Sequence, residues 1–302
     1  MDQPDINFDL YKVFCVVAEQ GNLSAAARKL FVSQSAVSQA IKQLENRLGG
    51  RLFNRTSRGV TLTAEGEMLF GYADSACKLL KNAEAKFFEM KNAQAGTVRI
   101  GASDTVCSLF LLDKLGSYHQ AYPNINMQVF NRTTGQLIEL LKSGAVDMIF
   151  INLPIDPDPA LEIREMMPVS DCFVVGGKYS FLARRTFSLK ELEQYPVLML
   201  ETTSHTRNML DAFLHSRGVY VTPAVELGSM ELLLDFAKIG LGIAAVARQA
   251  ADSRVRAGQL YPLRLSEPLP RRAIGLVTMH SVSLPFAATR FIRHIDGLDQ
   301  PD

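Results

Sequence analysis

The sequence lacks an apolar run long enough to cross a membrane. Its most apolar stretch, GLGIAAVA at 240–247, is far shorter than the roughly 20 residues that a membrane-spanning helix needs. The first nine residues, MDQPDINFD, are acidic and contain no apolar core, so we expect no signal peptide. These absences lead us to expect a cytoplasmic protein that does not act at a membrane.

The sequence also lacks the usual groupings of catalytic and metal-binding residues. It contains no G-x-S-x-G, no phosphate-binding loop and no C-x-x-C motif. The histidines are scattered, with no pair at the spacing of metal ligands. The four cysteines (Cys15, Cys77, Cys107 and Cys172) lie far apart, which favours reduced, mostly buried thiols over a disulfide framework. We therefore predict that the protein is not an enzyme and uses no metal or cofactor.

The formal net charge is only +1, but the charges are unevenly distributed. Between Arg28 and Arg58, seven lysines and arginines accompany a single acid, Glu45, so this segment carries +6 and the rest of the chain −5. With 302 residues, 47% of them apolar, the chain can form two or three globular domains. A basic segment on a nearly neutral chain is typical of a small nucleic-acid-binding module attached to a larger domain, although a solvated charged face would look the same.

Three short helices are predicted in and before this basic segment. The first spans 8–20 and ends at Gly21, and the second, which contains AAARKL, is expected to be capped by Ser24. After a short turn, Ser33 caps a third helix that runs to the glycine pair at 49–50. Three short helices, with a tight turn between the second and the third, describe a helix-turn-helix.

The third helix has an apolar face formed by Val37, Ile41, Leu44 and Leu48. Its opposite face carries small neutral polar side chains and one lysine, instead of the mixture of Glu and Lys that is usual on solvated helices. Such a face can enter a major groove and hydrogen bond to base edges without repelling phosphates. A three-helix bundle with a solvated polar face is the alternative. The candidate DNA-binding residues here are Ser33, Gln34, Ser35, Ser38, Gln39 and Lys42.

After the glycines, RLFNRTSRGVTLT predicts two short strands joined by a TSRG turn. A hairpin beside a recognition helix is a wing, and the arginines at its tip can reach phosphates or a narrow minor groove. Arg55 and Arg58 are therefore candidate DNA-binding residues, with two ordinary surface arginines as the alternative. We predict an all-α winged helix-turn-helix domain over residues 1–62.

The segment LSAAARKLFVSQSAVSQAIKQLENRLGGRLFNRTSRGVTLTAEG resembles the N-terminal module of LysR-type transcriptional regulators. The shared features are the alanine-rich second helix, the Ser-Gln pair that opens the third helix, its Leu-Glu ending and the Leu-Phe-x-Arg of the wing. The resemblance extends over roughly residues 8–66 and implies binding to double-stranded DNA. Members commonly carry arginine after the serine equivalent to Ser38, where this chain has Gln39, so the base preference at this position does not carry over.

A long linker helix is predicted over residues 63–93, with Thr63 as its cap. Its apolar residues recur at spacings of three and four, as in a heptad repeat: Leu69, Tyr72, Ala76, Leu79 and Ala83. Such a stripe needs a partner, and we favour a second chain over the chain's own C-terminal domain. The resemblance implies the same: a dimerising helix, an interrupted palindromic operator and, as a further expectation, a homotetramer.

From residue 97 onward, predicted strands and helices alternate, which indicates an α/β domain with largely parallel sheets. Helices are predicted near 105–121, 134–143, 204–217, 229–240 and 285–297, and LPIDPDPAL is predicted as a proline-rich surface loop. The predicted strands are TVRIGA (97–102), INMQVF (125–130), VDMIFIN (146–152), DCFVVGG (171–177), YPVLMLE (195–201), PAVELG (223–228), GIAAVA (242–247) and AIGLVTM (273–279).

Small hydroxyl residues follow several of these strands, at the carboxyl ends where ligands bind in open α/β sheets. Each of them could be a plain helix N-cap, but their recurrence at the same topological position favours a binding cleft. His205 and Arg207 could bind a carboxylate there, or could be surface residues of a helix. The candidate effector-binding residues are Ser103, Thr105, Thr133, Thr134, Thr203, Ser204 and Ser229.

The C-terminal half is also similar to the effector domain of LysR-type regulators, in which two lobes resemble periplasmic solute-binding proteins. VELGSMELLLDFAKIGLGIAAVA matches its serine-led helix followed by Gly-x-Gly-Ile. The resemblance implies an effector domain over 97–302, with lobe 1 at about 97–168 and 268–302, lobe 2 at about 169–267, and an effector between them. Helix N-termini that point inward favour an anionic effector.

These features predict a DNA-binding transcriptional regulator whose output depends on a small-molecule effector. Its candidate partners are double-stranded DNA, the effector, further copies of itself and RNA polymerase. An architectural, oligomerising DNA-binding protein with a ligand-blind C-terminal domain is one alternative. An enzyme or a secreted solute-binding protein is another. The sequence contains no catalytic cluster to support an enzyme and no signal peptide to support a secreted protein.

Overall fold

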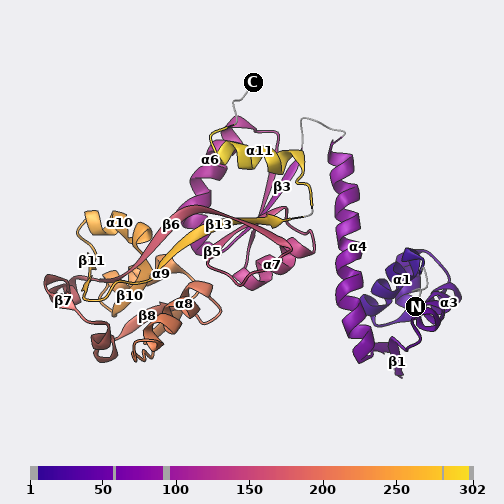
Figure 1. Ribbon diagram of the computed structural model, residues 1–302, viewed down its shortest axis with the longest axis horizontal. Helices are drawn as coiled ribbons and strands as arrows, with labels where there is room; N and C mark the ends of the chain where they lie inside the picture. The colour runs from indigo at the N-terminus through magenta and orange to yellow at the C-terminus, as the bar shows by residue number, and fades with distance from the viewer. Residues whose placement is uncertain (1–5, 57–58, 91–95, 281, 299–302) are drawn as a thin grey trace. The chain divides into compact units, whose positions relative to one another are not determined.

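The computed structural model describes residues 6–56, 59–90, 96–280 and 282–298, with the backbone alone described at 55, 85–86 and 88–90. The chain divides into two compact units, Met1–Phe88 with Ser143–Ala145, and Glu89–Lys142 with Val146–Asp302. Figure 1 shows their helices and strands. Within the described ranges, no helix is both long enough and apolar enough to span a bilayer.

The N-terminal unit is a helix-turn-helix followed by a hairpin and a long helix. Its elements are α1 (Phe8–Gln20), α2 (Leu23–Leu30), α3 (Gln34–Leu48), β1 (Phe53–Thr56), β2 (Gly59–Leu62) and α4 (Ala64–Met90). Gly21 and Gly49 end α1 and α3 with φ values of 59° and 73°, a left-handed conformation that glycine adopts without strain. The Ser33 hydroxyl accepts from the backbone N–H of Ala36 and so caps α3, which confirms that part of the prediction.

The prediction that Ser24 caps the second helix is wrong. Asn22 is the cap, because its extended backbone lets Oδ1 accept from the N–H groups of Ser24 (2.8 Å) and Ala25 (3.1 Å). The helix begins one residue before Ser24, whose own hydroxyl instead donates to Oε1 of Gln34 at 3.0 Å. The bond between Ser24 and Gln34 joins α2 to the first turn of α3 directly.

One apolar core holds the N-terminal unit together. The Phe14 ring of α1 is fully buried, and its centroid lies 5.4 Å from that of Phe53 in β1 and 6.3 Å from that of Phe70 in α4. Ala73 and Cys77 of α4 are buried in the same cluster. Because α1, the hairpin and α4 contribute to one core, the long helix begins as part of the DNA-binding fold.

The predicted heptad stripe of α4 lies largely outside this core. Tyr72 is 75% exposed and Leu79 is 38% exposed, and Ala76 and Ala83 are also exposed. Only Leu69 packs against the core. Exposed Met68 and Leu80 lie beside the same stripe, so α4 presents a largely exposed apolar strip.

The C-terminal unit is built on a nine-stranded sheet in the order β4-β3-β5-β13-β6-β10-β8-β9, with β11 also pairing with β6. One part, which we call lobe 1, contains β3 (Thr97–Ala102), α5 (Asp104–Val106), the π-helix η1 (Cys107–Leu111), α6 (Leu112–Ala121), β4 (Asn126–Asn131), α7 (Thr134–Lys142), β5 (Met148–Leu153), β13 (Arg271–Met279) and α11 (Phe286–Ile295).

The other part, lobe 2, contains shorter elements. They are the 3-10 helices η2 (Gly177–Arg184) and η3 (Leu189–Gln194), β7 (Thr186–Phe187), β8 (Val197–Leu200), α8 (His205–His215), β9 (Val225–Leu227), α9 (Met230–Lys238), β10 (Ile243–Ala247), α10 (Arg248–Arg256), β11 (Tyr261–Pro262) and β12 (Arg264–Leu265). The helix α10 and the short strands β7, β11 and β12 were not predicted from the sequence.

A single long strand, β6 (Leu161–Val175), joins the two lobes (Figure 1). Its first part, as far as Ser170, pairs with β13, and from Asp171 it pairs with β10. The sequence predicted only the second part, as DCFVVGG. The first part was missed because it carries charged side chains and Pro168 and is largely solvent-accessible.

The expectation of largely parallel sheets is only partly correct. Within lobe 1, β3 pairs in parallel with β4 and β5, and within lobe 2, β8 pairs in parallel with β9 and β10. The strands that connect the lobes are antiparallel: β13 to β5 and β6, and β10 to β6. The chain enters lobe 2 along β6 and returns to lobe 1 along the neighbouring strand β13, so these two strands run in opposite directions.

Candidate DNA-binding surface and ligand cleft

Helix α3 separates its residues as the sequence predicts except at Leu48, which was expected on the apolar face and is 42% exposed. Val37, Ile41 and Leu44 are buried, while Lys42 is exposed on the other side and Ser38 is half-buried. The candidates Ser33, Gln34, Ser35 and Gln39 are also exposed. The first turn is ordered by its own hydroxyls, with Oγ of Ser33 and Oγ of Ser35 2.9 Å apart. Because Ser24 occupies Oε1 of Gln34, the Gln34 amide N–H groups are left to donate outward.

The single acid of the basic segment is turned away from this surface. Oε1 of Glu45 accepts from the backbone N–H of Leu52 at 2.8 Å and of Phe53 at 3.4 Å. The carboxylate therefore fixes the start of the hairpin to the end of α3. Its negative charge is satisfied by backbone donors, so the outer face of α3 keeps the positive character that phosphates require.

The wing is a regular antiparallel hairpin in which Arg55 pairs with Val60 and Thr56 with Gly59. The tip at 57–58, which includes the candidate Arg58, lies outside the described residues, and so does the side chain of Arg55. The backbone register nevertheless places Arg55 next to the turn. The DNA-binding role of both arginines stays a prediction.

In the C-terminal unit, most of the predicted effector-binding residues line one cleft of about 230 Å³. They come from the segments that follow three strands: β3, β4 and β8. Ser229 does not line this cleft, although its neighbour Gly228 does. The predicted residues around the cleft are Ser103, Thr105, Thr133, Thr134, Thr203 and Ser204. Ser103 and Thr133 follow the adjacent parallel strands β3 and β4 of lobe 1, whereas Thr203 and Ser204 follow β8 of lobe 2, so both lobes contribute to the cleft.

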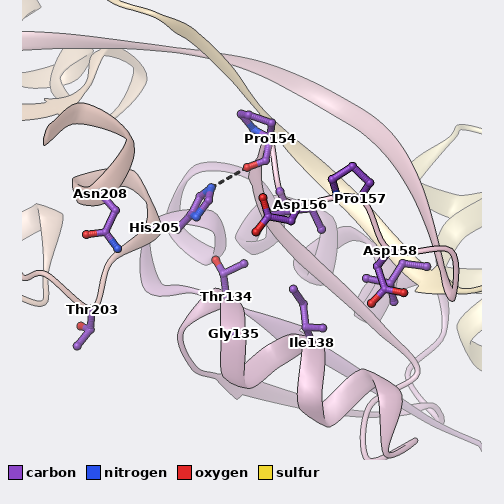
Figure 2. A pocket seen from close by; sticks show the side chains of 12 residues that line it. Thr134, Gly135, Ile138, Pro154, Asp156, Pro157, Asp158, Thr203, His205 and Asn208 are labelled. Atoms are coloured by element: carbon purple, nitrogen blue, oxygen red, sulfur yellow. Dashed lines mark hydrogen bonds between the residues drawn. The ribbon is translucent and has the colours of Figure 1, made fainter. Parts of the chain in front are cut away.

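A second, larger cleft of about 530 Å³ adjoins the first and shares Thr134, Thr203 and His205 with it. Figure 2 shows its walls: helix α7, the proline-rich loop after β5, and the start of α8. His205 reaches across from lobe 2, and its Nε2 lies 2.8 Å from the carbonyl oxygen of Pro154 in lobe 1. This hydrogen bond joins the two lobes between the two clefts.

The hydroxyl residues around the smaller cleft differ in what they bond. Oγ of Ser204 accepts from the N–H of Arg207 at 3.5 Å, so Ser204 acts as an ordinary helix cap. Thr133 donates to Oε1 of Gln136 through both its N–H and its hydroxyl, at 3.3 Å each. By contrast, the buried Oγ of Ser103 has no hydrogen-bond partner among the described atoms.

Arg207 does not face a ligand, although the sequence left that role open. Its side chain is only 6% exposed and its guanidinium is already bound. Nε lies 2.7 Å from Asp211 Oδ2, and Nη1 lies 2.6 Å from Glu226 Oε1 and 2.7 Å from the carbonyl oxygen of Leu200. Arg207 therefore anchors α8 to the strands β8 and β9. The spacing of four between Arg207 and Asp211 was the sequence signal for this role.

The charged groups around the smaller cleft are mixed in sign. Arg132 lines it together with Asp104 and Glu201. Sequence reasoning also missed a buried polar group here, Asn152 at the end of β5, which lines the same cleft. The sequence rule selected hydroxyl residues that follow strands, whereas Asn152 is an amide within the last residues of β5.

Three of the cysteines, Cys15, Cys107 and Cys172, lack the lowered pKa of a redox sensor. Burial raises the pKa of Cys172 to about 12, and burial together with Cys77 raises the pKa of Cys15 to about 12. Burial, and then the charge of Asp104, raise the pKa of Cys107 above its usual value. A reactive thiol needs a lowered pKa, so these three side chains stay protonated and unreactive at neutral pH.

Two family models together cover nearly the whole chain. Residues 8–67 match the bacterial regulatory helix-turn-helix protein, lysR family, and residues 91–299 match the LysR substrate binding domain. The chain is thus a transcriptional regulator with a helix-turn-helix and a C-terminal domain of the substrate-binding type. It belongs to the LysR family of transcriptional regulators.

Individual relatives match along most of the chain. The transcriptional regulator GltR of Bacillus subtilis is 27% identical, with 98% of this chain and 93% of the relative aligned. CzcR of Bacillus anthracis is 31% identical over 83% of each chain. The same fold occurs in a full-length OxyR variant from Pseudomonas aeruginosa (TM-score 0.65, 21% identity, 98% of this chain and 95% of that chain). It also occurs in full-length CbnR complexed with its target DNA (TM-score 0.64, 20% identity, 97% and 100%).

Proposed function

We propose that this regulator reads its operator with the outer face of α3 and contacts the flanking backbone with the wing. The exposed polar face of α3, free of acids, carries the proposal, together with the inward-facing carboxylate of Glu45. The structural similarity to CbnR bound to its target DNA supports it. Ser38 and Gln34 are the proposed base-reading residues, while Ser33, Ser35, Gln39 and Lys42 supply further base or phosphate contacts.

We infer that α4 pairs with the same helix of a second chain. An exposed apolar strip that contains Tyr72 and Leu79 would be buried by such pairing, as in a coiled coil. A dimer holds two recognition helices in a fixed relation, so its operator would be an interrupted palindrome. Two such dimers would form the tetramer, and the regulator would act on RNA polymerase from that assembly.

We further propose that a small anionic effector binds between the lobes and changes the regulatory output. The convergence of six predicted residues on one cleft supports this, as do the N-termini of α7 and α8 beside it. An effector that favours one lobe arrangement would shift the population of that arrangement, and with it the pairing of chains on the DNA. The alternative, a ligand-blind oligomerising domain, predicts no effector at all.

The DNA-binding proposal is tested by comparing operator and random DNA. We expect Ser38→Ala and Gln34→Ala to weaken operator binding by about 1–3 kcal/mol each, the value of a good base contact, and random DNA binding much less. The operator is first obtained by genome-wide mapping of binding sites, and affinities are measured at fixed salt. Gln194→Ala, at an exposed position outside the DNA-binding unit, is the matched control. Equal losses on both DNAs would make these residues phosphate contacts.

The effector proposal is tested by screening metabolites for thermal stabilisation of the full chain. For a confirmed effector, Ser103→Leu and Thr203→Leu should abolish stabilisation and the transcriptional response, while operator affinity stays at the wild-type value. A normal response in both variants would place the effector outside the cleft. A complete absence of stabilising metabolites would favour the ligand-blind alternative.

A further inference from the structure

A buried amide forms part of the floor of the smaller cleft. Asn152 lies at the end of β5, is only 4% exposed, and lines the 230 Å³ cleft together with Ser103. Strands β3 and β5 are paired in parallel with Ala102 beside Phe150, so Ser103, directly after β3, and Asn152, near the end of β5, lie on adjacent strands. The two side chains therefore belong to one polar patch at the sheet edge.

The orientation of the Asn152 amide is set by a neighbour that can only donate. Nη1 of Arg272 donates to the side-chain oxygen of Asn152. A guanidinium has no acceptor, so the oxygen must face Arg272 and the NH₂ group must face away from it. The hydroxyl oxygen of Ser103 is buried and has no hydrogen-bond partner among the described atoms, and the Asn152 NH₂ group makes no hydrogen bond within the described residues. Buried polar groups are normally bonded, so the unbonded Ser103 hydroxyl, in the same cleft as an amide with free donors, points to a ligand.

Arg272 is itself held rigidly. Its Nε and Nη2 donate to the two oxygens of Asp171, at 2.8 Å each, and its side chain is 1% exposed. Arg272 pairs with Val169, and Asp171 with Ala247 of β10, so this ion pair lies where β6 passes from lobe 1 to lobe 2. The amide of Asn152 is thus held by Arg272, which is itself held by Asp171 at the point where β6 passes between the lobes.

We propose that Asn152 is a specificity-determining residue that donates from Nδ2 to a carboxylate oxygen of the effector, with Arg272 as its positioning residue. The inference rests on the effector proposal and names the chemistry of the site. A carboxylate supplies two acceptor oxygens on one carbon, which suits the two adjacent donors, the Asn152 NH₂ and the Ser103 hydroxyl. Arg132 and the N-terminus of α7 add positive potential to the same cleft, whose lining also includes the acids Asp104 and Glu201.

The experiment uses sodium lactate as the carboxylate probe and lactamide as its neutral counterpart, each at about 50 mM, with ionic strength matched by sodium chloride. The melting temperature of the full chain is measured for wild type, Asn152→Asp and Asn124→Asp. Asn152→Asp keeps an acceptor for Arg272 and replaces the donor by a repelling charge. Asn124→Asp makes the same charge change at an exposed position outside the cleft.

We expect lactate, relative to lactamide, to raise the melting temperature of wild type and Asn124→Asp by about 2 °C, and that of Asn152→Asp not at all. Equal lactate shifts in all three proteins, or none in wild type, would overturn the proposal. Stabilisation of wild type by 1,4-diaminobutane alone would also overturn it while leaving a ligand-binding cleft in place. The effector proposal itself would still be tested by the metabolite screen.

Two further variants separate donation from folding. Without ligand, Asn152→Asp should melt at or above the wild-type temperature, whereas Asn152→Leu should melt lower, because it leaves a buried guanidinium N–H unpaired. Arg272→Lys retains the charge, but a lysine lacks the planar fork with which Arg272 donates to both Asp171 and Asn152. It should therefore reduce the increase in melting temperature that lactate causes. A full lactate shift in Arg272→Lys would show that Arg272 does not position the amide. If Asn152→Asp folds poorly, Ser103→Ala provides the second test, with a reduced lactate shift expected.

Discussion

Two glycines of α4 should respond oppositely to the same substitution, Gly→Ala. Gly66 lies in the first turn, where an added Cβ would stand 2.2 Å from the carbonyl oxygen of Leu52. An ordinary carbon–oxygen contact is about 3.3 Å or more, so the helix and the hairpin would have to separate by about 1 Å. Gly71, one and a half turns further along, has nothing within 4 Å of its added Cβ. It lies on the same helix face as exposed Lys78, away from the heptad stripe.

The expected magnitudes follow from these contacts. Separation at Gly66 weakens the bond from Thr63 N–H to the Leu52 oxygen (3.0 Å) and that from the Thr63 hydroxyl to the Arg51 oxygen (2.8 Å), each worth about 1 kcal/mol. Overpacking destabilises the unit by roughly 1–3 kcal/mol more, and the better helix propensity of alanine stabilises it by about 1 kcal/mol. We expect Gly66→Ala to destabilise the N-terminal unit by about 2–3 kcal/mol, and Gly71→Ala to stabilise it by about 1 kcal/mol.

Hydrogen exchange of the α1–α3 peptides in the full chain measures this effect within one unit, where a whole-chain melt would mix two units. Exchange through unfolding of the unit should accelerate roughly 30-fold or more in Gly66→Ala and slow roughly fivefold in Gly71→Ala. Operator affinity should fall in the first variant alone. Matching exchange rates in the two variants would show that α4 does not press against the hairpin at Gly66, and would refute the reasoning.

Two other expectations follow from local contacts. Asn22→Ala should lower the stability of the N-terminal unit by about 1 kcal/mol because it removes the cap of α2, and Ser24→Ala should lower it by less. Hydrogen exchange of α2 measures the two effects. A larger loss of stability in Ser24→Ala would show that Ser24 is the cap. Cys172, with its pKa raised to about 12, should resist iodoacetamide at pH 8.5 in the folded chain. The raised pKa also means that its contribution to stability, present below the unfolded value of about 9, is lost as the pH rises toward 12. Rapid alkylation of Cys172 at pH 8.5 in folded protein would contradict the pKa assignment.

The sequence was most informative where structure depends on neighbouring residues. Helix α1 begins and ends where the apolar spacing and Gly21 predict, and Ser33 caps α3. The error at Ser24 shows the limit of such signals, because Asn22 and Ser24 are both good cap residues two positions apart. The choice between them depends on the backbone conformation before α2, which the residue types alone do not determine.

The candidate cleft was predictable in part for a general reason. Residues after adjacent parallel strands converge, so a rule about strand ends brings Ser103 and Thr133 together without knowledge of the fold, whereas Thr203 follows β8 of the other lobe and meets them only through the arrangement of the two lobes. Asn152 was missed because it is an amide and because it lies within β5, whereas the rule selected hydroxyl residues that follow strands. Its contact with Arg272 joins residues 120 positions apart, and no periodicity in the sequence reports a pairing at such a distance.

The ion pair between Asp171 and Arg272 lies where β6 passes from lobe 1 to lobe 2, so it could respond to a change in the angle between the lobes. Since β6 runs unbroken from one lobe to the other, a change in the angle between the lobes must be absorbed by a few residues near the change of partner at Ser170 and Asp171. Asp171 and Arg272 are locked together at that point, and Arg272 also holds the amide at the floor of the cleft. A ligand that pulls on Asn152 therefore acts directly on the residues about which the lobes would rotate, so we expect occupancy and lobe angle to be coupled without any intervening loop.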